Sequence, residues 1–236
     1  MITNKNMQSG RSMIEMLGVL AIIGVLSVGG IAGYSKAMMK FKVNKTVDQV
    51  TQIATNIRTL FGGQRDYTKL TDQVIVKGLL MPDEMMVAAN TKSIKATSAG
   101  SYAKPFYENA WGLPVIITGN QSKITTDDGK AFVITYTDVP VEACLELAVM
   151  DWGSSSGSGL VAFSVSGNGE TLGNDNINAA TTVSCLKNKK PQSTKIVCAN
   201  ATDQAGRVPM NPADAAVLCS ANGSSTGVVN MHWKFY

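Results

Sequence analysis

A serine between glycines, with an acid and a base downstream, is the first pattern in this sequence that could carry chemistry. Gly153 to Gly157 reads Gly-Ser-Ser-Ser-Gly and matches G-x-S-x-G around Ser155, and Asp175 and His232 follow in the order of a hydrolase triad. That motif needs a strand before the serine and a helix after it, whereas the flanking residues predict a helix and then a strand. A segment rich in glycine and serine produces such matches easily, so we expect no enzyme.

The cysteines and the single histidine restrict metal and cofactor chemistry. Cys144, Cys185, Cys198 and Cys219 show no CxxC spacing, and His232 is the only histidine. No metal or cofactor is therefore expected. An even set of cysteines behind an export-type segment usually forms disulfides in an oxidising compartment. Four cysteines allow three pairings, and spacing alone does not choose among them.

A single carboxylate at the start of a long apolar run is the third candidate. Residues 13–33 carry one charge, Glu15, and about 20 apolar residues are what a helix needs to cross a bilayer core. A carboxylate within hydrocarbon costs several kcal/mol, so an acid in this place is expected to be functional and to have a partner. If the chain is cut before Arg11, the new amino terminus lies about one turn from Glu15, and a neighbouring subunit could supply an equivalent cation.

These residues resemble the class III signal of type IV pilins and of type II secretion pseudopilins. The resemblance lies in Gly10, Arg11 and Glu15 within GRSMIE, and in the apolar LGVLAIIGVLSVGG that follows. It implies that a prepilin peptidase cuts after Gly10, that Arg11 becomes the N-methylated first residue, and that Glu15 drives assembly. The first mature residue in this family is usually apolar, so Arg11 is a departure from the pattern.

The resemblance also implies a function and a set of partners. The chain would be the structural subunit of a type IV pilus of the b class, polymerising through its N-terminal helix for adhesion or aggregation. Its partners would be copies of itself in a helical filament, the prepilin peptidase, an inner-membrane assembly platform and a host-surface or abiotic receptor. The precursor would cross the inner membrane once, with a periplasmic head. A pseudopilin or a minor pilin is the alternative within the same assembly logic.

An ordinary signal peptide is the more distant alternative. Residues 1–32 would then be removed at Gly30-Ile31-Ala32, leaving an exported globular protein. Glu15 and the unbroken helical pattern argue against this. More basic residues follow the apolar run than precede it, which opposes a periplasmic head, but the cysteines favour an oxidising compartment and we give them more weight. The following lysines are Lys36, Lys40, Lys42 and Lys45.

The apolar run continues into an amphipathic segment. Gly62-Gly63 ends the helical pattern, so we expect one helix of about 50 residues from Ser12 to Phe61, near 75 Å long. Its first half would face lipid or other subunits, and its second half would bury one stripe against a sheet. The residues of that stripe are Val43, Val47, Val50, Ile53, Ala54, Ile57, Leu60 and Phe61.

Glycines are frequent in the apolar half of this helix. Gly29 and Gly33 would form a small-xxx-small face that permits close helix approach, and the general excess of glycine in membrane helices is the alternative explanation. The Gly29-Gly30 pair is also a place where the helix could melt locally when a subunit enters a filament. The glycines of this half are Gly18, Gly24, Gly29, Gly30 and Gly33.

The remainder has the composition of one folded domain, and its pattern predicts an α+β fold. The long helix would pack on an antiparallel sheet, and a disulfide would close the C-terminal region, as in the pilin fold. Strands are expected at 113–118, 131–137, 160–165 and 228–235, and helices at 71–80, after Pro82 and at 141–152. The domains would be a cleaved leader at 1–10, the transmembrane and filament-core helix at 11–34, its amphipathic half at 35–63 and a globular head at 64–236.

Residues 167–227 are rich in Asn, Ser, Thr and Gly and are broken by prolines, including Pro212, so loops are predicted there. The resemblance to type IVb pilins implies a Cys144–Cys219 bridge. Cys185 would then pair with Cys198 around a smaller basic loop, whose lysines are expected to be solvated. A net charge of +4 is too small to indicate a nucleic-acid partner.

Overall fold

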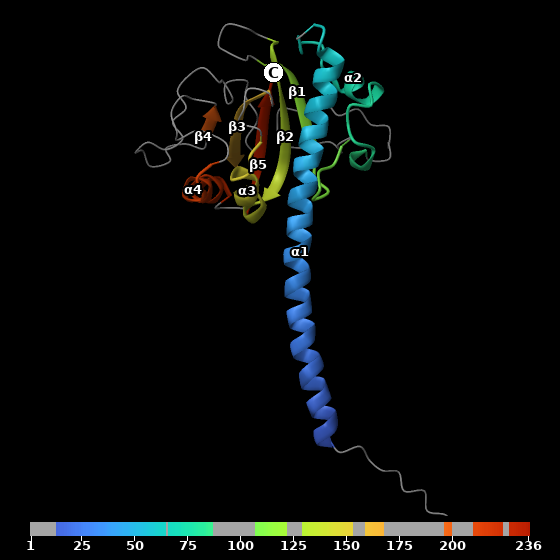
Figure 1. Ribbon diagram of the computed structural model, residues 1–236, viewed down its shortest axis with the longest axis vertical. Coiled ribbons are helices and arrows are strands. Elements are labelled where there is room, and N and C mark those ends of the chain that lie inside the picture. Colours follow the sequence, from blue (N-terminus) through green and yellow to red (C-terminus); the bar gives the residue numbers. More distant parts are fainter. Residues whose placement is uncertain are drawn as a thin grey trace, which may run out of the picture. The chain divides into compact units, whose positions relative to one another are not determined.

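The computed structural model describes residues 13–64, 66–86, 107–121, 129–152, 159–167, 196–199, 210–223 and 227–236. The chain divides into two compact units, Met1–Phe41 and Lys42–Tyr236. One helix, α1 (Met13–Phe61), contributes residues to both units, and the other helices and strands belong to the second (Figure 1). The long helix expected from the sequence is therefore present.

The second unit is built on an antiparallel sheet of five strands. They are β1 (Val115–Gln121), β2 (Ala131–Pro140), β3 (Leu160–Gly167), β4 (Ile196–Ala199) and β5 (Val228–Phe235). Their order in the sheet is β1-β2-β5-β3-β4. The last strand of the chain, β5, therefore lies in the middle of the sheet and bonds to β2 on one side and β3 on the other (Figure 1).

One face of the sheet carries an aromatic cluster. Tyr136 of β2 and Phe163 of β3 lie on either side of Trp233 of β5, with ring centroids 5.4 and 5.7 Å from it. Trp152 lies 5.1 Å from the same ring and donates its indole N–H to the Leu147 carbonyl at 2.8 Å. Aromatic rings at such separations stabilise each other beyond the area that they bury.

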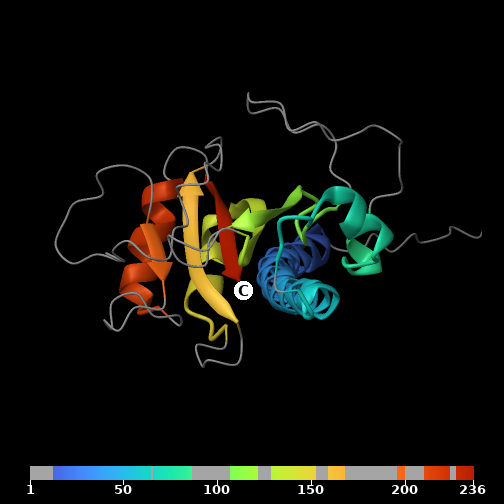
Figure 2. The same ribbon diagram turned by 90° about the horizontal axis from the view of Figure 1, so that it is seen from above.

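The second half of α1 packs on this aromatic face. The Arg58 guanidinium lies over the Phe235 ring at 5.7 Å, and both views show this half of the helix beside the sheet (Figures 1 and 2). Most of the expected stripe is therefore buried, at positions three or four residues apart that face one side of the helix. The buried residues of this half are Val43, Thr46, Gln49, Val50, Ile53, Ala54, Ile57 and Phe61.

Four positions differ from the expectation, since Thr46 and Gln49 are buried whereas Val47 and Leu60 are not. Leu60 was expected to be buried and is 53% exposed, whereas Gln49 is buried. The two are about three turns apart and so lie on the same edge of the helix. Gln49 is covered because it contacts Glu84 from a following segment. What lies over the helix edge, rather than hydrophobicity, decides which of these side chains is buried.

Four short helical elements complete the described part of the second unit. They are α2 (Asp72–Lys77), the 3-10 helix η1 (Asp83–Met85), α3 (Val141–Ala148) and α4 (Pro212–Gly223). α3 and α4 pack against each other; α3 also contacts β2 and β5, and α4 contacts β3 and β5. A disulfide joins Cys144 of α3 to Cys219 of α4.

The prediction of loops across 167–227 is wrong in two places, because β4 and α4 lie within that range. α4 begins where we expected Pro212 to break the chain. The Asn211 side chain accepts the Ala213 N–H at 2.9 Å, as an N-cap residue does. Proline is favoured at the first position of a helix, since its missing N–H would have no helical partner there. α3 is also shorter than expected and ends at Ala148.

Candidate functional site

The first half of α1 is an apolar surface that the chain itself leaves uncovered. An 18-residue window of this helix is apolar enough to cross a membrane by length and composition, and 0% of it is buried. Its large side chains are exposed in every direction around the helix. Their exposed fractions run from 51% at Met16 to 85% at Met13. Such an apolar area is far larger than a soluble surface normally presents, so it marks a contact with lipid or with other protein.

Glu15 is the charged group of this surface and lies in the first turn of α1. Its side chain is exposed, and the next charged residue along the chain is Lys36. The first turn suits a carboxylate because the unpaired N–H groups there carry partial positive charge. Gly10 and Arg11, the residues of the expected cleavage, lie outside the described residues. The structure therefore places Glu15 at the exposed N-terminal end of an uncovered apolar helix.

The glycines of this half are helical, and the described residues leave open the space that a side chain at each of them would take. A Cβ added at Gly24, Gly29, Gly30 or Gly33 would meet nothing within 4 Å. The helix runs through all four positions in the isolated chain. No packing against the residues that the structure describes therefore requires glycine there. Whether Gly29-Gly30 melts in a filament stays a prediction.

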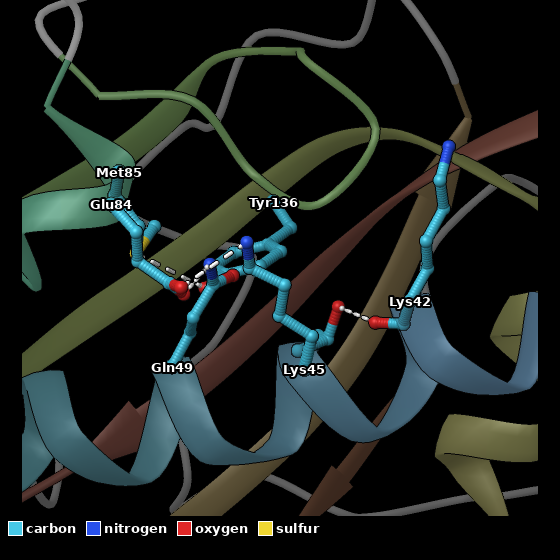
Figure 3. Close-up of polar contacts among 7 residues, drawn as sticks. Lys42, Lys45, Gln49, Glu84, Met85 and Tyr136 are labelled. Atoms are coloured by element: carbon cyan, nitrogen blue, oxygen red, sulfur yellow. Dashed lines mark hydrogen bonds and ion pairs between the residues drawn. The ribbon is translucent and has the colours of Figure 1, made fainter. Parts of the chain in front are cut away.

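The second half of α1 carries a polar cluster that ties it to η1 and β2, which we call the clasp: Lys45, Gln49, Glu84 and Tyr136. Gln49 donates from Nε2 to Glu84 Oε1 at 2.8 Å and accepts the Tyr136 hydroxyl on Oε1 at 3.3 Å (Figure 3). Lys45 Nζ lies 3.2 Å from Glu84 Oε2. Both ends of the Gln49 amide are therefore used, each by a different element.

The pKa values of the two acidic groups in the clasp, Glu84 and Tyr136, are both shifted from their usual values. The hydrogen bond from Gln49, followed by the hydrogen bond and charge of Lys45, lowers the pKa of Glu84 below its usual value. Burial raises the pKa of Tyr136 well above its usual value, with a smaller contribution from the Glu84 charge. Glu84 therefore remains a carboxylate and Tyr136 a neutral phenol near neutral pH. The glutamine at a stripe position was the signal in the sequence that could have revealed this cluster.

The cysteines divide between described and undescribed parts of the chain. The bridge between Cys144 and Cys219 is the pairing that the resemblance implied, and both residues are fully buried. Cys198 lies on β4, but Cys185 lies outside the described residues. The Cys185–Cys198 pairing therefore stays a prediction.

Of the three residues of the hydrolase-like pattern, the structure describes His232 alone. Ser155 and Asp175 lie outside the described residues, and the elements on either side of the serine are α3 and then β3, the reverse of a nucleophile elbow. His232 lies within the sheet, 1% exposed, with Nδ1 3.0 Å from Thr135 Oγ1. Burial lowers its pKa to about 3. Within the described ranges, no group of three or more His, Cys, Asp or Glu could hold a metal ion.

An exposed apolar helix that continues onto an α+β head, with a disulfide closing the C-terminal region, is the architecture of a type IV pilin of the b class. The sequence model of the Bundlin family matches residues 36–196 of the 236. The chain belongs to the Bundlin family.

Two relatives and two solved structures are similar to this chain. The relatives are each named the major structural subunit of bundle-forming pilus, from Escherichia coli O111:H- and Escherichia coli O127:H6 (strain E2348/69 / EPEC). Each is 24% identical over 207 residues, which is 88% of this chain and 95% of the relative. A type IV b pilin from Salmonella typhi has a TM-score of 0.42 at 19% identity, covering 80% of this chain and 97% of that one. TcpA, a type IV pilin from Vibrio cholerae El Tor, has a TM-score of 0.48 at 13% identity, covering 83% of this chain and 99% of that one.

Proposed function

We propose that this chain is the structural subunit of a type IV pilus of the b class, which polymerises through α1 into an extracellular filament. The observation that carries the proposal is the apolar half of α1, of which an 18-residue window is 0% buried within the chain. In the precursor, lipid would cover this surface, and in the filament the same half of neighbouring subunits would cover it. Membership of the Bundlin family supports the assignment, since the matching relatives are pilus subunits.

Glu15 is proposed as the assembly residue. Once a subunit leaves the membrane for the filament, a carboxylate among apolar helices needs a cation beside it, because an unpaired charge there costs several kcal/mol. The amino terminus of a neighbouring subunit, about one turn from its own Glu15, would supply that charge. The pairing would fix the axial position of one subunit against the next.

The test is the Glu15→Gln variant, which keeps the shape of the side chain and removes its charge. Glu142→Gln is the matched control, because Glu142 is an exposed glutamate on α3 of the head. We expect Glu15→Gln to leave the amount of protein in membranes unchanged and to reduce sheared filaments at least tenfold. Filaments at the wild-type level in Glu15→Gln, or an equal loss in the control, would contradict the assignment.

Processing by a prepilin peptidase follows from the same proposal. The peptidase would cut after Gly10 and leave Arg11 as the methylated first residue. Peptide mass analysis of sheared filaments should then find a chain that starts at Arg11, with or without one methyl group. A start near Gly33 in secreted material would instead mean an ordinary signal peptide.

The remaining assignments complete the proposal. The segments would be a leader at 1–10, the membrane and filament-core helix at 11–34, its amphipathic half at 35–63 and the head at 64–236. The precursor would sit in the inner membrane with a periplasmic head and would be taken up by an assembly platform. The filament would contact a host-surface or abiotic receptor. We assign no enzymatic role, and neither a pseudopilin nor a minor pilin is favoured by relatives that are major subunits.

A further inference from the structure

Three exposed polar residues follow the apolar run of α1 within about two helical turns. Tyr34 is 66% exposed, and Lys36 and Lys40, one helical turn apart, are also exposed. We call these three residues the collar. All three belong to the unit Met1–Phe41. In the part of the chain that the structure describes, neither collar lysine is in an ion pair, whereas the later Lys45 contacts Glu84 at 3.2 Å.

The position of the collar on the helix matches the headgroup layer of a bilayer. Tyrosine is enriched at the membrane–water interface, where its ring lies in the apolar boundary and its hydroxyl reaches water. Helical side chains tilt toward the N-terminus of the helix. From Lys36 and Lys40 that direction is toward the apolar run, so both ammonium groups reach back into the layer where lipid phosphates lie.

The spacing between Glu15 and Tyr34 determines where Glu15 lies in the bilayer when the collar lies at one interface. Nineteen residues separate Glu15 from Tyr34, and at about 1.5 Å per residue they span roughly 28 Å. The hydrocarbon core of a bilayer is about 30 Å thick. A helix whose Tyr34 lies at one interface therefore carries Glu15 at the opposite interface, within reach of water.

We propose that the collar binds the headgroups of acidic phospholipids and sets the depth of α1 in the membrane, which keeps Glu15 at the opposite interface until assembly. This inference rests on the proposed function, since it requires α1 to cross a bilayer before the filament forms. It also explains how an acid in the apolar helix is tolerated in the precursor. The carboxylate would leave water only when the helix is drawn out of the bilayer, and there a neighbouring cation would meet it.

The first experiment measures which lipids accompany the full-length protein. The chain is reconstituted into vesicles of phosphatidylcholine with a minor fraction of phosphatidylglycerol, and bound lipids are counted by native mass spectrometry. The test variant is Lys36→Gln with Lys40→Gln. The control is Lys69→Gln with Lys77→Gln, which removes the same charge from two exposed lysines of the head.

We expect the wild type and the control to enrich phosphatidylglycerol, and the collar variant to lose that enrichment by about fivefold for each lysine. Equal enrichment in the collar variant and the wild type would overturn the proposal that the collar binds acidic lipids. An equal loss of enrichment in the control would overturn it too. Failure of the wild type to float with vesicles would instead contradict the membrane stage of the proposed function. The two failures are therefore distinguishable.

The second experiment measures the depth of Glu15. Proteoliposomes are treated with a water-soluble carbodiimide and an amine, or with a membrane-soluble carbodiimide, and the Glu15 peptide is analysed by mass. Modification of wild-type Glu15 by the water-soluble reagent is the expected result, with less modification in the collar variant because its depth is no longer set. Modification of the wild type by the membrane-soluble reagent alone would refute the proposed depth.

Discussion

Removing the bridge between α3 and α4 should destabilise the head strongly. Cys144 and Cys219 are 75 residues apart in sequence and both are fully buried. Closing a loop of that length in the unfolded chain reduces its entropy, and the chain-entropy relation gives about 4.5 kcal/mol of stabilisation at 25 °C. For a domain of this size, each kcal/mol moves the melting temperature by about 2–4 °C. We therefore expect the melting temperature to fall by about 9–18 °C.

The assay compares three forms of the full chain in detergent micelles: oxidised, reduced, and the double variant Cys144→Ala with Cys219→Ala. The reduced form keeps all the sulfur atoms but loses every bridge, including Cys185–Cys198 if that bridge forms, so its loss of stability measures the cross-links together. The double variant removes the Cys144–Cys219 bridge alone. It should lose somewhat more than the stabilisation estimated for that bridge, because replacing two buried cysteines by alanine also removes packed atoms. Unfolding in urea, followed by tryptophan fluorescence, measures the free energy of unfolding of each form.

A second pair of cysteines serves as the comparison. If Cys185 and Cys198 are joined, closing their shorter loop stabilises the folded chain by about 3 kcal/mol by the same relation. Peptide mapping of the oxidised chain checks both pairings directly. A bridge from Cys144 to Cys185 would refute the pairing, and equal urea midpoints for the oxidised and reduced chains would refute the loop-closure argument.

Three further changes test the rest of the head. Leu79 has a φ of +50° and is 72% exposed, so Leu79→Gly should stabilise by about 0.5–1 kcal/mol in thermal melts, while Leu79→Ala, which keeps the Cβ, should not. Gln49→Leu leaves the buried Tyr136 hydroxyl without its amide acceptor and should cost about 1–3 kcal/mol in urea unfolding; Glu84→Gln should cost less, since that side chain is half exposed. The pKa of His232 is about 3 when folded against an ordinary 6.5, so the unfolded chain binds more protons between these values and the free energy of unfolding should fall as pH drops through that window, by up to about 1.4 kcal/mol per pH unit. His232→Gln should remove that part of the pH slope, and an unchanged slope would contradict the burial argument.

The elements that could be predicted are those with a strong local period. α1 showed a continuous apolar run in its first half and helical spacing in its second, and β2 and β5 are runs rich in β-branched and aromatic residues that the sheet buries. α4 was missed because its sequence is mostly small residues and its stability comes from packing on α3 across the bridge. The cap that begins it, Asn211 followed by Pro212, was nevertheless visible in the sequence, and we interpreted that proline as a helix breaker.

Contacts between distant segments were harder to predict than the elements that make them. Gln49 interrupts an apolar stripe, which indicates a buried polar partner, but nothing local names Glu84 or Tyr136 as that partner. The central place of β5 likewise depends on pairing with β2 and β3, far away in sequence. Glu15 was proposed as a functional residue on purely local grounds, because the argument for it comes from the apolar residues beside it in the sequence and uses no tertiary contact.

The glycines of the apolar half of α1 suit contacts between subunits and not contacts within one subunit. Each glycine inside a helix costs about 1 kcal/mol relative to alanine, and no contact in the described part of the chain requires Gly24, Gly29, Gly30 or Gly33. These four positions therefore weaken the helix of the isolated subunit by roughly 4 kcal/mol with no packing in return. In a filament the same residues would let neighbouring helices approach closely or let this segment unwind. Either benefit would arise only between subunits, which agrees with an apolar half that the described part of the chain leaves uncovered.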